Sequence, residues 1–532
     1  MQYYFISEQA FTIDFGNNQT LSKNISIHAI VQYFQKNPIE GIVDIVPSSE
    51  TISFFFDIQL IPSSSESFAQ SIFDVVQHLK IEPKLINSKE ISIPICFDES
   101  LALDLMDVCN NTHLTKNAFK QLFLGNTYTV AHLGFLPGFP YITGLNTQLQ
   151  LKRKDTPNPR VPAKSVAIAN DKIGIYPFTT PGGWHIIGSI PFNLFSLNQA
   201  NPFLFNEGFK VHFFEIDLPT YKATLEEQIS SLSIPASKNP SLKIIKSIGI
   251  NTIQSTPRLG HLSKGVPLGG FMLPSLANQL LSVIKISAVN PIIELAMGTL
   301  QIKVIKPFRF AFAGSIHVYI NNMPQQQFNP ISVKEGDDLN VVYNGNGIYG
   351  YMAFDGTINI PKILGSYSTS INAQLGYLIQ KNDNLEIKKT SKLIAATANK
   401  PLMKSSVIRC FKAHEFDCLN DDSKQKIFAS FFEMDVQANR MAIKLKSEKL
   451  VTHSPIEISS TAVTVGTVQL TPNGQLIVLM NDAQATGGYP RILQIAKVDI
   501  ELLAMHKPGE NIQFKLISFE EATQLLLLNY NS

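Results

Sequence analysis

Two runs that combine glycine and proline with aromatic residues constrain this chain more than any other feature. The run GFLPGFPYITGL spans residues 134–145, and PGGWHIIG follows at residues 181–188. Glycine allows positive φ and close backbone approach, while proline restricts φ. Loops of this composition can hold flat side chains in place, so we expect them to shape a pocket rather than to act as linkers. Trp184, in the second run, is the only tryptophan of the chain.

Length and charge exclude several classes of protein. A chain of 532 residues is too long for one hydrophobic core, so we expect roughly three or four domains. The net charge of +2 gives no electrostatic basis for binding nucleic acid or acidic membranes. The N-terminus lacks a signal-peptide pattern, and no apolar run reaches the ~18 residues of a membrane span. We therefore expect a cytoplasmic protein without nucleic-acid or membrane partners.

The four cysteines predict no special chemistry. Cys96, Cys109, Cys410 and Cys418 show neither CxxC spacing nor the density of a disulfide scaffold. We expect reduced thiols and no metal site.

Hydrophobic spacing predicts a small two-layer α+β domain over residues 1–90. Strands should alternate buried and exposed side chains, whereas helices should bury positions three and four apart. The strand predicted at 91–95 lies just past this boundary. The order strand, helix, strand, strand, helix, strand groups it with this domain. The predicted strands are 3–5, 11–15, 41–46, 51–56 and 91–95, and the helices have the apolar faces Ile27, Ile30, Val31 and Phe34, and Ile72, Val75, Val76 and Leu79.

Residues 91–218 are predicted to form a closed or nearly closed β-barrel. Two short helices are expected before residue 125, and Thr115 is the expected N-cap of the second. Short strands and Gly/Pro turns then continue to about residue 218. The serines and prolines of residues 219–242 indicate a linker.

The chain after the linker is again predicted to consist mostly of short strands. Its clearest helix is 274–284, with Pro274 in the first turn. A strand, turn, strand and Gly-Gly-aromatic corner occurs in both halves, at PGGW (181–184) and TGGYP (486–490). This echo is compatible with a duplicated barrel and equally with a common kind of corner.

Arg160 is the most informative polar residue of the first half. It lies between Pro159 and Pro162, so its guanidinium could be aimed at a carboxylate or a phosphate. Lys164 and Ser165 could add a cation and a hydroxyl. A structural salt bridge of Arg160 at a rigid barrel corner is an equal alternative. The expected apolar wall and glycine corner of a binding site comprise Phe139, Tyr141, Tyr176, Gly182, Gly183 and Trp184.

Polar residues near glycines mark a second candidate region. Gln254 and Arg258 precede the run GVPLGG at residues 265–270. Loop residues of these types are also common as solvated side chains or caps. The later candidates near the second Gly-Gly corner are Arg440, Gln469, Asp482, Thr486, Gly487, Gly488 and Tyr489. The P-loop, the GxGxxG fingerprint, the GxSxG elbow and HExxH are all missing, which excludes those templates but not enzymes in general.

The first half closely resembles a known family. The runs GFLPGFPYITGL, PRVPAKSVAIA, GIYPF and PGGWHIIG are similar to allophanate hydrolase subunit 1, also described as the B subunit of 5-oxoprolinase and as the kinase inhibitor KipI. The resemblance covers about residues 1–218. It implies an N-terminal α+β domain followed by a cyclophilin-like β-barrel.

The second half resembles the companion family, allophanate hydrolase subunit 2, or the C subunit of 5-oxoprolinase. The runs IQSTPRLGHLSKGVPLGG, IIELAMGTLQI, NRMAIKL and GTVQLTPNGQLIVLMNDAQATGGYPRI carry this resemblance. It implies two further β subdomains, 243–385 and 386–532, in a β-barrel-rich unit. The expected fold class is therefore mainly β with α+β, in a natural fusion of the B and C subunit types. The same pair forms the carboxyltransferase domain of urea carboxylase.

The second half departs from the family motifs at charged positions. Ser255 stands where the motif QDLGR has its acid, and Leu273 stands where SGAMD has its acid. Tyr367 replaces the arginine of GSRST, and Ala442 replaces the glycine of RMG. Arg258, Arg440, Gln469 and the TGGYP corner remain, so we expect any mechanism of this chain to work without the replaced charges.

The resemblance implies an enzyme component that works with a separate A subunit of 5-oxoprolinase and opens 5-oxoproline to glutamate, using ATP with Mg as co-substrate. Arg160, Lys164 and Arg258 are then the candidates for contact with the substrate carboxylate or phosphate. A carboxyltransferase role in a urea- or allophanate-type system is an alternative. It needs a separate biotin carrier, because no Ala-Met-Lys-Met type attachment site is present and we expect no bound biotin. A regulator of a sensor histidine kinase is a third hypothesis. Self-association is compatible with each of them.

Overall fold

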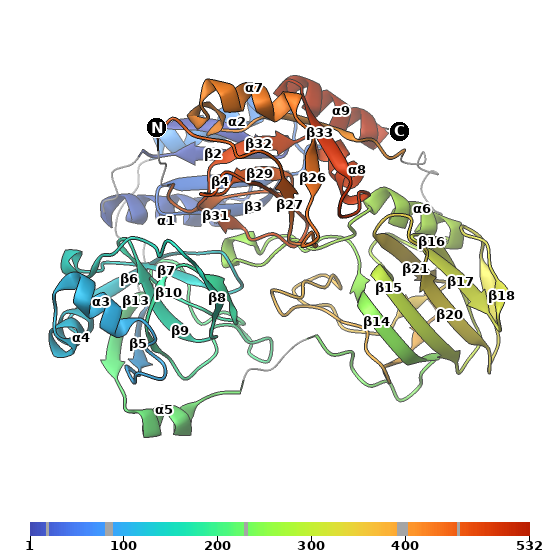
Figure 1. Cartoon of the computed structure of the whole chain (residues 1–532), viewed down its shortest axis with the longest axis horizontal. Helices are drawn as coiled ribbons and strands as arrows, with labels where there is room; N and C mark the ends of the chain where they lie inside the picture. The colour runs from blue at the N-terminus through green and yellow to red at the C-terminus, as the bar shows by residue number, and fades with distance from the viewer. Residues whose placement is uncertain (17–20, 80–88, 228–231, 391–402, 455–457, 532) are drawn as a thin grey trace.

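The structure is a computed structural model that describes every residue except 17–20, 80–88, 228–231, 391–402, 455–457 and 532. It is mainly β, as predicted, and Figure 1 shows its sheets gathered into separate units. Within the described residues, no helix combines the length and apolar character needed to span a membrane.

The first unit is a four-stranded antiparallel sheet with the order β1-β2-β4-β3. Two helices pack on it and share its hydrophobic core. The buried stripe of the second helix includes Ala69 and Val76. Val75 was predicted to be buried, but it is exposed, because one residue along a helix turns the side chain by about 100° from that stripe. The elements are β1 (Gln2–Ser7), β2 (Ala10–Asp14), α1 (Leu21–Lys36), β3 (Ile42–Pro47), β4 (Thr51–Phe56) and α2 (Ser65–His78).

The strand predicted at 91–95 does not join this first sheet. It forms β5 (Glu90–Ile95), which pairs in parallel with β13 (Lys210–Glu215) in the next unit. Ile93 and Ile95 are fully buried there, so packing against the barrel core outweighs proximity in the sequence.

The second unit is a nearly closed β-barrel with the order β12-β9-β10-β7-β6-β13-β5. Cys96 and Ser189 join its two edges through a pair of backbone hydrogen bonds of 2.9 and 3.1 Å. Thr115 caps the second helix as predicted, because its Oγ1 accepts from the backbone N–H of Ala118 at 3.2 Å. The elements are α3 (Leu105–Thr112), α4 (Lys116–Leu124), β6 (Thr127–Leu133), β7 (Pro140–Thr143), β8 (Asn158–Val161), β9 (Ser165–Ala169), β10 (Lys172–Ile175), β11 (Thr180–Gly182) and β12 (His185–Ser189).

The segment predicted as a linker contains α5 (Leu218–Thr224), and the third unit follows it. This unit is a nine-stranded sheet in which the long strand β15 (Ile292–Val304) pairs with three neighbours. Helix α6 (Pro274–Ile284) packs on the sheet and begins with proline, as predicted. The other strands are β14 (Leu242–Gln254), β16 (Phe308–Gly314), β17 (Ile316–Ile320), β18 (Met323–Pro324), β19 (Ile331–Val333), β20 (Asp338–Tyr343), β21 (Tyr349–Phe354) and β23 (Asn384–Leu385), with β22 (Thr357–Ile358) and β24 (Ile387–Lys388) in a separate small pair.

The fourth unit is a closed barrel with the order β25-β32-β29-β30-β27-β26-β33. Position by position, this order corresponds to β5-β12-β9-β10-β7-β6-β13 of the first barrel, including the parallel pair. The two halves of the sequence echo therefore lie at equivalent places in two barrels of the same topology. The elements are β25 (Val407–Lys412), α7 (Asp421–Ala429), β26 (Phe432–Met434), β27 (Ala442–Lys446), β28 (Thr461–Ala462), β29 (Thr467–Leu470), β30 (Leu476–Leu479), β31 (Thr486–Gly487), β32 (Arg491–Ile495), α8 (Ile500–Ala504), β33 (Asn511–Leu516) and α9 (Phe519–Asn531).

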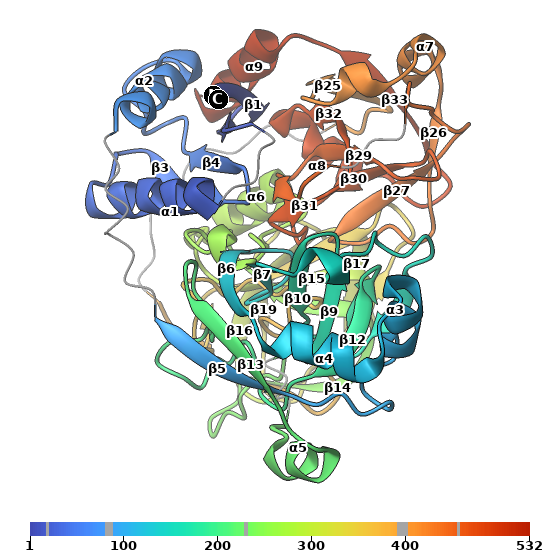
Figure 2. The same ribbon diagram turned by 90° about the vertical axis from the view of Figure 1, so that its left-hand side faces the viewer.

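The two ends of the chain pack together. The N-terminal sheet lies beside the C-terminal barrel, and both lie above the first barrel in Figures 1 and 2. Tyr4 stacks on His414 with ring centroids 3.6 Å apart, and its hydroxyl lies 3.0 Å from Nη2 of Arg491. The halves are thus interleaved rather than placed end to end.

Candidate functional site

Loops from both halves of the chain meet at one junction. The backbone N–H of Phe135, in the first glycine-proline run, donates to Oγ1 of Thr486 at 3.1 Å. A Cβ on Gly134 would lie 2.4 Å from that same oxygen. Gly265 has φ of +75°, and a Cβ there would lie 2.2 Å from the carbonyl oxygen of Leu136. Glycine at these positions therefore allows the two halves to come into contact.

A small pocket of about 10 Å³ lies at this junction, which is room for about one water molecule. Its wall combines apolar side chains with one carboxylate and two amides. The lining residues are Phe135, Leu136, Pro267, Asn372, Ala373, Met441, Asp482, Ala483 and Gln484. The first two come from the first half of the chain and the others from the second half, so neither half forms this pocket alone.

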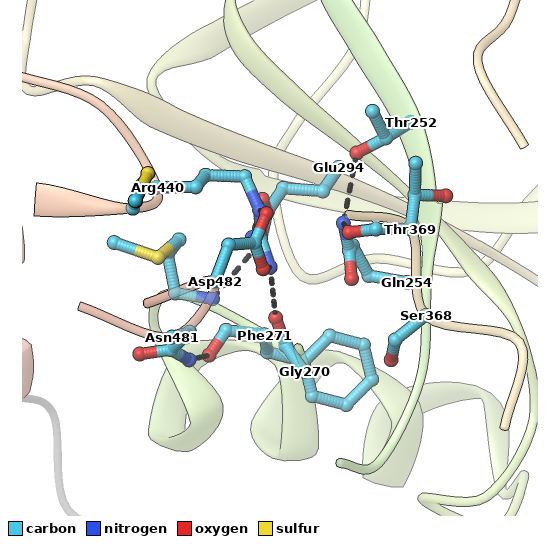
Figure 3. Close-up of polar contacts among 12 residues, drawn as sticks. Thr252, Gln254, Gly270, Phe271, Glu294, Ser368, Thr369, Arg440, Asn481 and Asp482 are labelled. Carbon is cyan, nitrogen blue, oxygen red and sulfur yellow. Dashed lines mark hydrogen bonds and ion pairs between the residues drawn. The ribbon is translucent and has the colours of Figure 1, made fainter. Parts of the chain in front are cut away.

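Arg440 organises the buried charges behind the pocket (Figure 3). Its Nε and Nη2 donate to the two carboxylate oxygens of Asp482 at 3.0 and 2.9 Å. Its Nη1 donates to Glu294 at 2.5 Å, and Nη2 also donates to the carbonyl of Gly270 at 2.8 Å. One guanidinium thereby binds residues from two loops and one strand.

The charges of this cluster are stabilised by pairing. Burial alone would lower the pKa of Arg440, but Asp482 and Glu294 outweigh it and hold the pKa above its ordinary value. Burial raises the pKa of Asp482, while Arg440 acts in the opposite direction. The other oxygen of Glu294 accepts from the backbone N–H of Met272 and from the hydroxyl of Tyr351, at 3.0 and 2.7 Å. Asp482 is the member of the cluster that also lines the pocket.

Arg258 lies near this cluster but is paired differently. Its Nε and Nη2 donate to the carbonyls of Ile363 and Ser368 at 3.0 and 2.7 Å. Its Nη1 has no partner among the described residues, although the side chain is 1% exposed. Burial lowers the pKa of Arg258 to about 10, and the charge of Asp482 opposes this. A buried cation held only by carbonyls is electrostatically suited to an incoming anion.

Gln254 binds the same segment as Arg258. Its Nε2 donates to the carbonyl of Thr369 at 3.0 Å and to Oγ1 of Thr252 at 3.1 Å. Its Oε1 is buried and has no partner among the described residues. Gln254 and Arg258 thus both fix the segment 368–369 that borders the cluster.

Ser255, Tyr367 and Leu273, which stand at positions where the family motifs have charges, have surroundings of different kinds. Oγ of Ser255 lies 3.2 Å from Oγ of Ser366, and the backbone N–H of Ser255 donates to Oγ of Ser368 at 3.2 Å. The ring of Tyr367 lies under the ammonium of Lys362, which is 5.5 Å from the ring centroid. Leu273 is buried in the hydrophobic core. The segment is therefore held by hydroxyl hydrogen bonds in addition to the guanidinium of Arg258.

The predicted aromatic wall of the first barrel is brought together. The ring of Phe139 lies 5.0 Å from Tyr141, 5.2 Å from Tyr176 and 5.9 Å from Trp184, centroid to centroid. A Cβ on Gly182 would lie 2.4 Å from the hydroxyl of Tyr176, whereas Gly183 has its nearest atom at 3.8 Å. This cluster also includes Leu136, Val266 and Ala373 of the junction.

The polar residues predicted in the first half lie elsewhere. The side chain of Arg160 is exposed on β8, and its backbone N–H bonds to Asn158. Lys164 is buried, with φ of +70°, and its ammonium donates to the carbonyls of Pro191 and Glu226. Ser165 is buried in β9. None of these three lines the junction pocket.

The second Gly-Gly corner forms part of the contact between the barrels. Gln469 is buried, and its Nε2 donates weakly to the carbonyl of Tyr489 at 3.4 Å. A Cβ on Gly487 would lie 2.6 Å from that Nε2. A Cβ on Gly488 would lie 3.3 Å from a guanidinium nitrogen of Arg153, which belongs to the first half.

Glu294, Asn372 and Arg153 are among the residues of these sites that were not predicted from the sequence. Glu294 had a usable signal, since a lone acid inside the apolar run IIELAMG must be paired when the strand is buried. Asn372 and Arg153 stand in polar loops without any pattern. Only their place in the folded chain identifies them.

Comparisons with known proteins agree with this division of the chain. Residues 1–205 match the family described as carboxyltransferase domain, subdomain C and D, and residues 264–516 match carboxyltransferase domain, subdomain A and B. The chain is 30% identical to the 5-oxoprolinase B subunit of Bacillus subtilis (strain 168) over 230 residues, covering 42% of this chain and 95% of that protein. It is 31% identical to the 5-oxoprolinase C subunit of Escherichia coli (strain K12) over 290 residues, covering 53% of this chain and 93% of that protein. The crystal structure of TTHA0988 has the same fold, with a TM-score of 0.82 and 24% identity over 95% of this chain and 100% of that chain.

Proposed function

This chain belongs to the carboxyltransferase-domain family and joins a half of the 5-oxoprolinase B type to a half of the C type, and we propose that it is the B/C component of an ATP-dependent 5-oxoprolinase. With a separate A subunit, the assembly would convert 5-oxoproline, ATP and two waters to glutamate, ADP and phosphate. Opening a lactam is uphill, so coupling to ATP, with Mg as its counterion, supplies the driving force. The observation that carries the proposal is the junction built jointly by the two halves, where Phe135 binds Thr486.

Polar and apolar groups at the junction support the proposal. Asp482 lies at the junction, and Arg440 fixes the orientation of its carboxylate through two hydrogen bonds. Such a carboxylate can accept an N–H and can take up a proton as the ring opens. Phe135 and Leu136 would supply an apolar wall beside the ring.

Arg258 would supply positive charge for the substrate carboxylate or for a phosphoryl group. It lies beside Gly269, whose Cβ position is 3.9 Å from Nη1 of Arg258, and its charge acts on Asp482. Carbonyls hold it more weakly than a carboxylate would, so an anion can compete for this guanidinium. The exposed Arg160 is then a candidate for contact with the A subunit, and Lys164 for positioning the first barrel.

The decisive experiment measures glutamate release from 5-oxoproline with this chain and a homologue of the A subunit, with and without ATP. We expect release only when both proteins and ATP are present. Absence of glutamate under all combinations would exclude the 5-oxoprolinase assignment. An Arg258→Met chain that still assembles with its partner should lose most of the activity.

A carboxyltransferase role is the second candidate, since both matched families are described as carboxyltransferase domains. The same junction would then bind an amide or urea acceptor, and the carboxyl group would pass to the acceptor from a carboxylated biotin on a separate carrier, leaving biotin free. Transfer of labelled carbon dioxide from carboxybiotin to an amide, in the absence of ATP, would distinguish this role from lactam hydrolysis.

A further inference from the structure

We propose that Lys164 fastens the connection between the two halves to the first barrel, so that this connection works as a strap that limits how far the first barrel and the third unit can separate. The described parts of the strap are residues 218–227, on the first barrel, and residues 232–241, on the third unit. In Figure 1, α5 lies below the first barrel, on the side away from the N-terminal sheet. The strap therefore joins the two units far from both ends of the chain.

The first part of the strap is bound to the first barrel at several points. The hydroxyl of Tyr221, a buried residue of α5, lies 2.9 Å from Oγ of Ser189 on β12. The backbone N–H of Glu226 donates to the carbonyl of Pro191 at 2.9 Å. The carboxylate of Glu226 accepts from the backbone N–H of Asn193 at 2.8 Å. These contacts hold the chain against the barrel well beyond its last strand.

Lys164 is the charged member of this attachment. Its ammonium donates to the carbonyl of Glu226 and, at 3.3 Å, to the carbonyl of Pro191. The residue is 5% exposed and has φ of +70°, a left-handed conformation that is unfavourable for a residue with a Cβ. Such a conformation persists only where the surrounding contacts fix it. Hydrogen bonds from a charged donor are stronger than those between neutral groups, so Lys164 contributes more to the attachment than each neutral contact.

The second part of the strap is bound to the third unit. The carbonyl of the buried Leu232 accepts from the backbone N–H of Leu378 at 2.9 Å. Oγ of Ser237 donates to the carboxylate of Glu386 at 3.0 Å. Glu227 and Leu232 are five residues apart, and a chain of that length reaches at most about 18 Å. The two attached parts therefore cannot separate further unless one of them detaches.

The strap restrains an apolar contact between the same two units. Trp184 of the first barrel is 8% exposed and packs in the cluster that also contains Val266, Ala373 and Leu375 of the second half. Separation of the first barrel from the third unit would admit water to this cluster. Polar contacts on other sides of the molecule keep the halves associated, so the strap controls local opening of this contact rather than assembly.

The test measures quenching of Trp184, the only tryptophan, by acrylamide in the full chain. Lys164→Met removes the ammonium, and Lys164→Gly removes it while relieving the positive φ, so the second variant is expected to fold. A third variant inserts about twenty Gly and Ser residues between Glu227 and Leu232, which lengthens the strap and leaves Lys164 in place. We expect each variant to raise the quenching constant roughly twofold or more. Lys222→Met, at an exposed lysine of α5, is the matched control and should leave it unchanged.

Combined variants identify the cause of the increase. If Lys164 acts through the strap, Lys164→Gly adds no further quenching to the lengthened chain, because the restraint is already lost. Additive increases, an unchanged quenching constant in the lengthened chain, or an equal increase in Lys222→Met would overturn the inference.

Hydrogen exchange of residues 218–227 gives a second readout. Lys164→Gly should speed exchange of the Glu226 amide, which is bonded to Pro191, whereas the lengthened chain should retain its protection. Unchanged protection in Lys164→Gly would show that Lys164 does not hold the strap and would also overturn the inference.

Discussion

Single residues in this protein carry contacts that join distant segments. Arg440 binds Asp482, Glu294 and the carbonyl of Gly270, which come from the C-terminal barrel, the long strand β15 and the glycine loop before α6. Removing such a cation leaves two buried carboxylates without a positive charge beside them, and the cost of that exceeds the net value of the ion pairs themselves. One side chain thus determines whether the junction keeps its shape.

Arg440→Met should therefore destabilise the protein by about 3–5 kcal/mol and abolish glutamate release. Lys446→Met is a matched control, because Lys446 also pairs with two carboxylates, Glu433 and Asp435, but its side chain is 45% exposed. The control should change stability by less than about 1 kcal/mol. Urea unfolding of both variants measures the difference, and equal losses would contradict the assignment.

Gly174 has a comparable role in the aromatic cluster. A Cβ there would lie 2.6 Å from the ring of Phe139 and 2.8 Å from that of Trp184. We expect Gly174→Ala to displace both rings, to cost about 1–3 kcal/mol and to shift the fluorescence of the single tryptophan. Gly183→Ala, next to Trp184 but with its nearest atom at 3.8 Å, should leave the emission unchanged.

Among the secondary-structure elements, short polar contacts set where helices begin and how they dock. Helix α6 starts at Pro274, and the backbone N–H of Ser275 donates to Glu501 on α8 at 2.9 Å. The hydroxyl of Ser275 donates to the same carboxylate at 3.1 Å. Glu501 therefore links the third unit to the C-terminal barrel through a helix N-terminus.

Burial raises the pKa of Glu501 from 4.5 to about 7, which makes this link sensitive to pH. The folded state then holds a proton that the unfolded state releases between pH 4.5 and 7, so stability falls as pH rises through that window. Glu501→Gln keeps an acceptor for Ser275 but cannot ionise.

As pH rises from about 4.5 to 8, the unmodified chain should lose stability that Glu501→Gln keeps. We therefore expect the unfolding free energy of the variant to rise relative to that of the unmodified chain by about 1–3 kcal/mol over this range. Urea titrations at several pH values test this. Glu335→Gln, at an exposed position, should run parallel to the unmodified chain. A Glu501→Gln difference that does not change with pH would show that the carboxyl stays ionised throughout.

Across the whole molecule, the two halves are joined by polar contacts on several sides. Lys264 pairs with Glu207 at 2.7 Å, and the backbone N–H of Leu262 donates to buried Asp44 at 2.6 Å. The backbone N–H of Lys497 donates to Glu8 at 2.7 Å. These contacts, with the shared pocket, make the halves one structural unit regardless of the connection between them.

A protease site inserted between Glu227 and Leu232 should therefore leave the cut halves associated. We expect them to elute together in size-exclusion chromatography, and glutamate release to persist at concentrations above their dissociation constant. Separate elution at micromolar concentration would show that covalent linkage is what maintains the junction. Adding Lys264→Ala and Asp44→Ala to the cut chain should promote separation.

Periodicity and capping chemistry allowed much of the secondary structure to be predicted, because they act over a few residues. The strand pairs of the first sheet, the cap at Thr115 and the start of α6 at Pro274 follow from such local rules. The position of β5 in the barrel could not be predicted in this way, because it depends on a parallel partner more than a hundred residues away.

The sequence by itself determined the two families, the mainly β architecture and the motifs that supply site candidates, since these depend on long local patterns. Only the tertiary structure brought Phe135, Asn372 and Asp482 to one pocket, exposed Arg160 and bound Lys164 to backbone carbonyls. The physical reason is that charge pairing and burial are decided between segments distant in sequence. Arg440 meets Glu294, 146 residues away, and no local pattern records that encounter.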